Sequence, residues 1–95
     1  MGVHQAVTMM QTEVERSAVL EARLRQDSLR RRLPPPSARR AIRQQHGLSA
    51  AAVGSYCGVS RQVAAAWERG ERNPSGERLE RYAELLQRLM QGGSS

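Results

Sequence analysis

The chain has 95 residues, which is enough for one small domain with an extension. Fifteen basic residues against nine acidic ones give a formal net charge of +6, which indicates an anionic partner. A single cysteine excludes an intramolecular disulfide, and the lack of a long apolar run excludes a membrane span and a signal-peptide core, so we expect a cytoplasmic protein.

All of the basic residues are arginine. The guanidinium group presents a rigid fork of donors that matches phosphate and guanine, so the choice favours nucleic acid, although a GC-rich source would also explain the absence of lysine. Residues 37–72 hold six arginines against two glutamates. Residues 1–36 hold six against four acids, and residues 73–95 hold three against three, so the excess lies in the middle of the chain.

Residues 1–33 are expected to form a long N-terminal helical arm, because no glycine or proline follows Gly2 and most residues favour helix. An approximate apolar stripe consists of Val3, Val7, Met10, Val14, Ala18, Ala22, Leu29 and Leu33. Thirty helical residues span about 45 Å, more than a small domain can cover. We therefore expect the arm to meet another chain, either a second copy or a protein partner, with a frayed arm as the alternative.

The arm ends in Arg30, Arg31 and Arg32, which either compensate the helix dipole or contact phosphate. Residues 34–36, three prolines, cannot continue a helix and are expected to form a rigid linker.

Ser37 is then predicted to cap a helix over residues 38–46, which Gly47 ends. Its apolar face is Ala38, Ala41, Ile42 and Gln45, and its basic face is Arg39, Arg40 and Arg43. We expect at least one of these arginines to contact phosphate.

Two short helices joined by a tight turn follow. Ser49 is placed to cap the first helix, and Gly58 to end it in the left-handed conformation. Ser60 is placed to cap the second, and Gly70 to end it. This spacing predicts a helix-turn-helix.

The second of these helices has two distinct faces. Val63, Ala64 and Trp67 are expected to turn inward. Gln62, Ala65, Ala66 and Arg69 follow helical spacing and are expected to share one outward face, which carries no acid and has two methyl-sized residues at its centre. A helix that lies deep in a groove needs both features, so we interpret this helix as the one that reads DNA.

The last helix is expected from about residue 76 to residue 90, after a turn and cap at Asn73, Pro74 and Ser75. Its stripe is Leu79, Tyr82, Ala83, Leu86, Leu89 and Met90. Leu85 lies off the stripe, so it marks an alternative dimer contact. Residues 91–95 are expected to be a disordered tail.

The apolar residues that these helices turn inward form the predicted core, which is Ile42, Leu48, Val53, Cys57, Val59, Ala64, Trp67, Leu79, Ala83 and Leu86.

At these residues the chain resembles the lambda-repressor-like, or Cro-type, helix-turn-helix regulators. The matching pieces are Gly47-Leu48-Ser49, Gly58-Val59-Ser60-Arg61, Trp67-Glu68-Arg69-Gly70 and Arg72-Asn73-Pro74-Ser75. The resemblance implies an all-α fold, here a compact helix-turn-helix bundle of four short helices, or five, over residues 37–90, preceded by the long helical arm and the triple-proline hinge.

The resemblance also implies that residues 60–69 enter the major groove of operator DNA. The residues expected to contact DNA are Ser49, Ser60, Arg61, Gln62, Ala65, Ala66, Arg69 and Arg72, with Arg39 and Arg43 from the preceding helix. Trp67 resembles the family's buried aromatic residue, and Glu68 is expected to hold the following loop.

The chain departs from the family pattern in three places that bear on its function. Ala50 stands where a phosphate-binding glutamine is frequent, Gly54 loosens the first helix of the pair, and Ala64 leaves space under Trp67 for a neighbour to fill. The family's fifth helix is also missing, and the arm is a candidate to supply its packing.

The function we expect is a sequence-specific DNA-binding transcriptional regulator, a repressor from a bacterium or phage, working as a homodimer in the bacterial or host cytoplasm. The alternatives are an antitoxin whose arm binds a protein partner, and an accessory protein of recombination. Residues His4, His46 and Cys57 form no catalytic or metal-binding spacing. We therefore expect no catalysis, no cofactor and no membrane partner.

Overall fold

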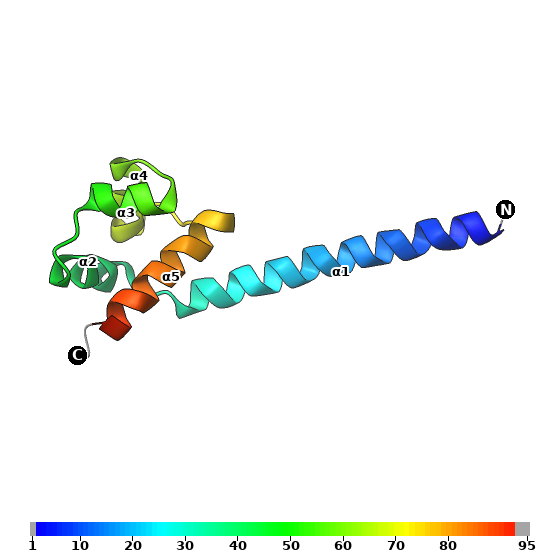
Figure 1. The fold of residues 1–95 in the computed structure, drawn as a ribbon, viewed down its shortest axis with the longest axis horizontal. Helices are drawn as coiled ribbons and strands as arrows, with labels where there is room; N and C mark the ends of the chain where they lie inside the picture. Colours follow the sequence, from blue (N-terminus) through cyan, green and yellow to red (C-terminus); the bar gives the residue numbers. More distant parts are fainter. Residues whose placement is uncertain (1, 93–95) are drawn as a thin grey trace.

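The computed structural model describes residues 2–92, with side chains from Glu13 onward. Five helices follow one another in it: α1 (Gly2–Arg32), α2 (Pro36–Gln45), α3 (Ala50–Cys57), α4 (Arg61–Arg69) and α5 (Gly76–Gly92). Helices α2 to α5 form a bundle, and α1 projects from it as a long rod (Figure 1). The molecule measures 63 × 29 × 19 Å, so the arm accounts for most of its length. The fold is all-α, which confirms the predicted class.

The predicted linker is shorter than three prolines. Pro36 is the first residue of α2, where its fixed φ suits the helix and its missing N–H would have had no partner within the helix. Pro35 occupies the N-cap position, and its carbonyl accepts hydrogen bonds from the N–H groups of Ala38 and Arg39 at 3.0 and 3.1 Å. The prediction that Ser37 caps this helix is therefore wrong.

The core lies where α3, α4 and α5 meet. Its buried residues include Val53, Cys57, Ala64, Trp67, Tyr82 and Leu86. Leu79 is fully buried as predicted, whereas Ile42 and Val59 are only partly buried at the edge of the cluster. Leu85 also packs against this core, so it is not the exposed contact that its place off the stripe predicted.

The space under Trp67 is filled by Tyr82. The two ring centroids are 4.8 Å apart and the planes are inclined at 44°, a favourable tilted arrangement. Only 1% of Tyr82 is exposed, and burial raises the pKa of its hydroxyl to about 12. The space that the small side chain of Ala64 leaves under Trp67 is thus occupied by an aromatic residue of α5.

The C-terminal end of the arm is fixed to the bundle. The Gln26 side chain donates to the Gly76 carbonyl at 3.2 Å and accepts from the Gly76 N–H at 2.8 Å, so it binds the first residue of α5 twice. Arg25 forms an ion pair with Glu80 at 3.0 Å, and Leu33 packs against the core. The arm therefore supplies packing to α5, as expected for a bundle without a further helix.

The last helix is longer than predicted. It continues through Gln91 and Gly92, which were expected to belong to a disordered tail. The rest of that predicted tail, residues 93–95, lies outside the described residues. The side chains of Val3, Val7 and Met10, the first three residues of the apolar stripe on the arm, are also outside them.

Candidate nucleic-acid interface

The turn between α3 and α4 forms as the sequence predicts. The Ser49 hydroxyl accepts from the Ala52 N–H at 3.0 Å, and the Ser60 hydroxyl accepts from the Val63 N–H at 3.2 Å, so both serines are N-caps. Gly58 ends α3 with φ of 77°, a left-handed conformation that glycine adopts without steric cost. Both hydroxyl groups still have a proton to donate, which leaves them able to contact phosphate.

Gly54 allows the two helices to approach each other closely. A Cβ atom at this position would lie 2.7 Å from the Val59 carbonyl oxygen and 3.0 Å from that of Ser60. The Val59 N–H also donates to the Gly54 carbonyl at 2.8 Å. The glycine that was expected to loosen α3 is therefore required by the contact that holds the start of α4.

The buried face of α4 is wider than predicted. Ala64 and Trp67 are 1% and 2% exposed, as expected, but Ala66 is only 6% exposed and does not belong to the outward face. Helix α4 packs against both α2 and α3, and the Glu71 N–H of the following loop donates to the Ala66 carbonyl at 3.0 Å. Because Ala66 is buried, the prediction that it contacts DNA is wrong.

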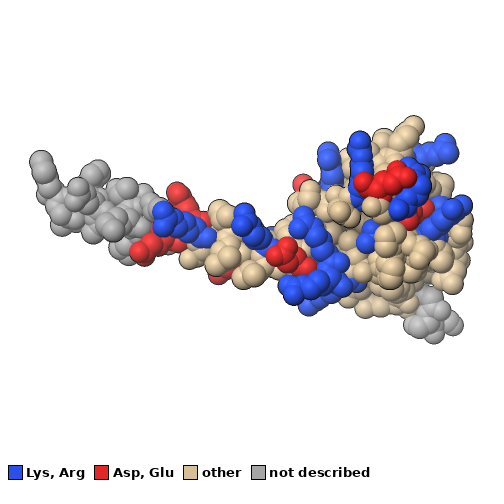
Figure 2. Space-filling model, turned by 180° about the vertical axis from the view of Figure 1, so that it is seen from behind, with Lys and Arg blue, Asp and Glu red and all other residues tan. Residues whose placement is uncertain are grey.

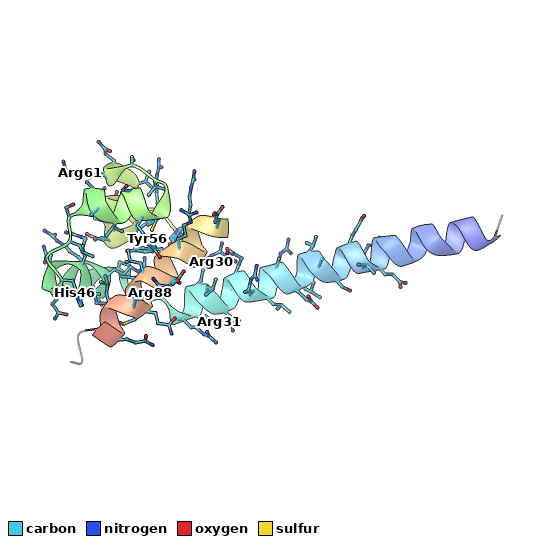
Figure 3. All side chains as sticks on the ribbon, viewed as in Figure 1. Arg30, Arg31, His46, Tyr56, Arg61 and Arg88 are labelled. Carbon is cyan, nitrogen blue, oxygen red and sulfur yellow. The ribbon has the colours of Figure 1, made fainter. Side chains whose placement is uncertain are left out.

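The outward face of α4 is narrower but remains free of acid at its centre. Arg61 and Gln62 are exposed in the first turn, Ala65 is half-buried in the middle, and Arg69 is exposed at the end. Figure 3 shows Arg61 at the outer edge of the bundle, pointing into solvent. A methyl group at the centre lets this helix approach another surface closely, with longer polar side chains around it.

A shallow hollow lies between α2 and α4 beside this face. It is lined by Arg40, Arg43, Ala50, Arg61, Ala65, Glu68 and Arg69. Arg40 is exposed and comes from α2, so two helices present guanidinium groups around the hollow. Figure 2 shows the basic side chains gathered over the bundle, with acidic ones between some of them.

Arg39 has a structural role. It is 8% exposed, and its guanidinium donates to the Pro34 carbonyl at 2.8 Å and to the Trp67 carbonyl at 3.0 Å. These bonds join the linker, α2 and the end of α4. The prediction that Arg39 lies on an outward basic face is wrong, because its guanidinium is buried and binds the carbonyl groups of Pro34 and Trp67.

Arg43 is also used inside the protein. Its Nε and Nη2 groups donate to both oxygens of Glu68, the second at 3.0 Å, and its Nη1 donates to the Leu48 carbonyl at 2.8 Å. Only 14% of the Arg43 side chain and 7% of the Glu68 side chain are exposed. The hydrogen bonds to Glu68 raise the pKa of Arg43 above its ordinary value. Arg43 is thus not a free phosphate ligand, and Glu68 holds α2 rather than the following loop.

The loop after α4 is held by other groups. Arg69 donates to Glu71 through Nε at 3.0 Å and Nη2 at 3.1 Å, and more than half of each side chain is exposed. The hydrogen bond from Arg69 lowers the pKa of Glu71. The Glu71 N–H donates to the Ala66 carbonyl at 3.0 Å, and Arg72 is exposed beyond it. This pair leaves one Arg69 edge, with Nη1, for another acceptor.

The basic cluster at the end of the arm lies apart from this surface. Figure 3 shows Arg30 and Arg31 at the end of α1, where it meets the bundle, and Arg61 at the far edge of the bundle. Arg30 forms an ion pair with Asp27 at 3.5 Å, and Arg31 donates to the Asp27 carbonyl at 3.4 Å. These arginines sit in the last turn of α1, where positive charge complements the helix dipole.

Comparison with known families then assigns the fold. The sequence model of a helix-turn-helix family of the lambda-repressor and Cro type matches residues 40–90, more than half of the chain. The chain belongs to this family. The helix-turn-helix protein is accordingly a DNA-binding transcription regulator, and α4 is the second helix of its binding motif. Neither a curated protein nor a solved structure matches it significantly.

In the part of this helix-turn-helix protein that the structure describes, no helix has the length and apolar character needed to span a membrane. The same part of the chain holds no group of three His, Cys, Asp or Glu residues suited to a metal ion. Cys57 is buried, and burial raises the pKa of its thiol to about 11, as for an inert core residue.

Proposed function

We propose that the chain is a sequence-specific repressor that binds double-stranded DNA as a homodimer and inserts α4 of each copy into the major groove. The observation that carries this proposal is the surface formed by Arg40, Arg61, Ala65 and Arg69, where exposed guanidinium groups from two helices surround a methyl group. A surface of this chemistry fits a groove whose walls are phosphates and whose floor is base edges.

The roles follow from the chemistry of each side chain. Arg61, at the N-terminal end of α4, forks onto guanine or grips phosphate, and Gln62 pairs with adenine. Ala65 contacts the methyl group of thymine. Arg40 contacts the phosphate backbone beside the groove, and Ser49 and Ser60 donate their remaining protons to phosphate.

Acidic groups do not oppose this approach. Glu68 lies in the hollow, but Arg43 neutralises its carboxylate through two hydrogen bonds. Glu71 is exposed at the edge and is paired with Arg69. Two copies that place α4 in successive major grooves about 34 Å apart would cover a promoter and block polymerase.

Selection of bound duplexes from a random pool tests the proposal without knowledge of the operator. We expect enrichment of two related half-sites about one helical turn apart. Arg61→Ala should then weaken binding to the selected site by roughly 1–3 kcal/mol and relax the preference at one base position. Arg88→Ala is the matched control, since Arg88 lies on α5 and pairs with Glu84. Binding that shows no sequence preference and disappears at moderate salt would contradict the proposal.

A further inference from the structure

The free part of the arm exposes an unusual amount of apolar surface. All residues from Glu13 to Arg25 are exposed, among them Val14 at 68%, Val19 at 61%, Leu20 at 56% and Leu24 at 55%. From Gln26 onward the helix lies against α5. A helix without tertiary contacts is only marginally stable in water, so this segment needs a partner along its length.

One face of this segment has a defined order of groups. A shallow hollow on it is lined by Glu15, Arg16, Val19, Leu20 and Arg23. Glu15, Val19 and Arg23 are spaced four residues apart, so they follow one another along the same side of the helix. The acid stands at the N-terminal end of this stripe, the apolar residue at its centre, and the arginine at its C-terminal end.

The charges of the segment indicate which partner fits. Residues 13–25 contain three glutamates and three arginines, with the acids concentrated before residue 22 and the last two arginines after it. Figure 2 shows acidic and basic side chains interleaved along the arm. A neutral surface that carries acids is poorly suited to DNA or to an anionic membrane. It is complementary to a second copy of itself in antiparallel orientation, because the acidic half of one helix then meets the basic half of the other.

We infer that residues 13–25 pair in antiparallel orientation with the same segment of a second copy. A two-fold axis beside Val19 brings the two Val19 and Leu20 side chains together. It also sets Glu15 of each copy at the same level as Arg23 of the other, and it creates this pair twice. A parallel pair would instead set Glu15 against Glu15 and Arg23 against Arg23.

This pairing deepens the proposed function, because it names the surface that joins two copies of the regulator. It also agrees with the packing of α5, where Leu85 is taken up by the core of its own chain. The two bundles then lie toward opposite ends of the paired arms, since each arm leads into its own bundle at residue 33.

Sedimentation equilibrium of the full-length protein without DNA tests this pairing separately from DNA binding. We expect a concentration-dependent dimer. Val19→Gln with Leu20→Gln should shift the protein to monomer. Glu15→Arg alone and Arg23→Glu alone should each weaken dimerisation by on the order of tenfold, because each reverses two contacts. The combined variant, Glu15→Arg with Arg23→Glu, should recover wild-type association.

The control variant is Glu84→Arg, which makes the same change in charge as Glu15→Arg but on the exposed side of α5. It should leave the association unchanged. A monomer at every concentration, or a dimer that is indifferent to Glu15→Arg, would overturn the antiparallel arm pairing. A dimer that survives both glutamine substitutions would place the interface elsewhere, for example at the exposed Met90 on α5, and would equally overturn it. None of these results bears on the insertion of α4 into the major groove, and only a monomer at every concentration would also remove the homodimer from the proposed function.

Discussion

The partly buried pair between Arg43 and Glu68 provides the sharpest test of which arginines fold the protein and which bind DNA. Glu68→Ala removes both acceptors and leaves the Arg43 side chain, 14% exposed, with only the Leu48 carbonyl as partner. Breaking a fully buried pair costs about 3–5 kcal/mol, and since this pair is partly buried the loss should lie toward the lower end of that range. A small domain has about 5–15 kcal/mol in total, so the variant should lose much of its stability. Urea unfolding followed by circular dichroism measures the change.

The paired replacement Arg43→Met with Glu68→Leu removes both charges and keeps the volume. It should recover most of the stability, because no charge is left buried alone. Since the Arg43 guanidinium is already bound to Glu68 and to the Leu48 carbonyl, this variant should also bind DNA with an unchanged salt dependence. Arg40→Ala, the control on the exposed side of α2, should fold normally and lower the salt slope by about 0.9 for one lost phosphate contact. A folded double variant with a reduced slope would refute the reasoning.

Three further predictions concern the fold. Gly54→Ala should destabilise the protein by about 1–3 kcal/mol in thermal melts, because its Cβ would lie 2.7 Å from the Val59 carbonyl oxygen; a neutral result would contradict the close helix contact. Arg39→Met should cost about 1–3 kcal/mol by removing the hydrogen bonds to the Pro34 and Trp67 carbonyls, whereas an exposed phosphate ligand would change stability little. Stability should fall as pH rises from about 9 to about 11, because the Cys57 thiol has its pKa raised to about 11 in the folded protein and releases its proton earlier when unfolded. Unfolding titrations should show this slope reduced in Cys57→Ala.

The sequence predicts those parts of the fold that depend on local rules. Ser49 and Ser60 cap their helices because a serine hydroxyl satisfies an N–H group that the helix cannot. Gly58 and Gly70 end theirs because the left-handed conformation favours glycine. The apolar stripe of α5 likewise depends on helical spacing, and its residues Leu79, Tyr82 and Leu86 are buried as expected, whereas Met90 at its end is exposed.

What the sequence does not predict depends on contacts between distant elements. Arg39 and Arg40 are neighbours of the same type, but only Arg39 is buried, where it binds the carbonyl groups of Pro34 and Trp67. Ala65 and Ala66 are also neighbours of the same type, but Ala65 is half-buried beside the hollow between α2 and α4, whereas Ala66 is buried. Helical spacing predicts the direction in which each side chain leaves the helix. It does not predict which of those directions another part of the protein covers.

The central claim is that the outward face of α4 lies against base edges, and amide chemical-shift mapping of the 10.6 kDa protein with its selected duplex tests it most directly. We predict that the largest changes fall on Arg61, Gln62, Ala65 and Arg69, with smaller ones at the N-terminal caps and none along residues 13–25. Changes confined to the arm and its Arg30 to Arg32 cluster, with α4 unaffected, would contradict this account of how the protein binds DNA.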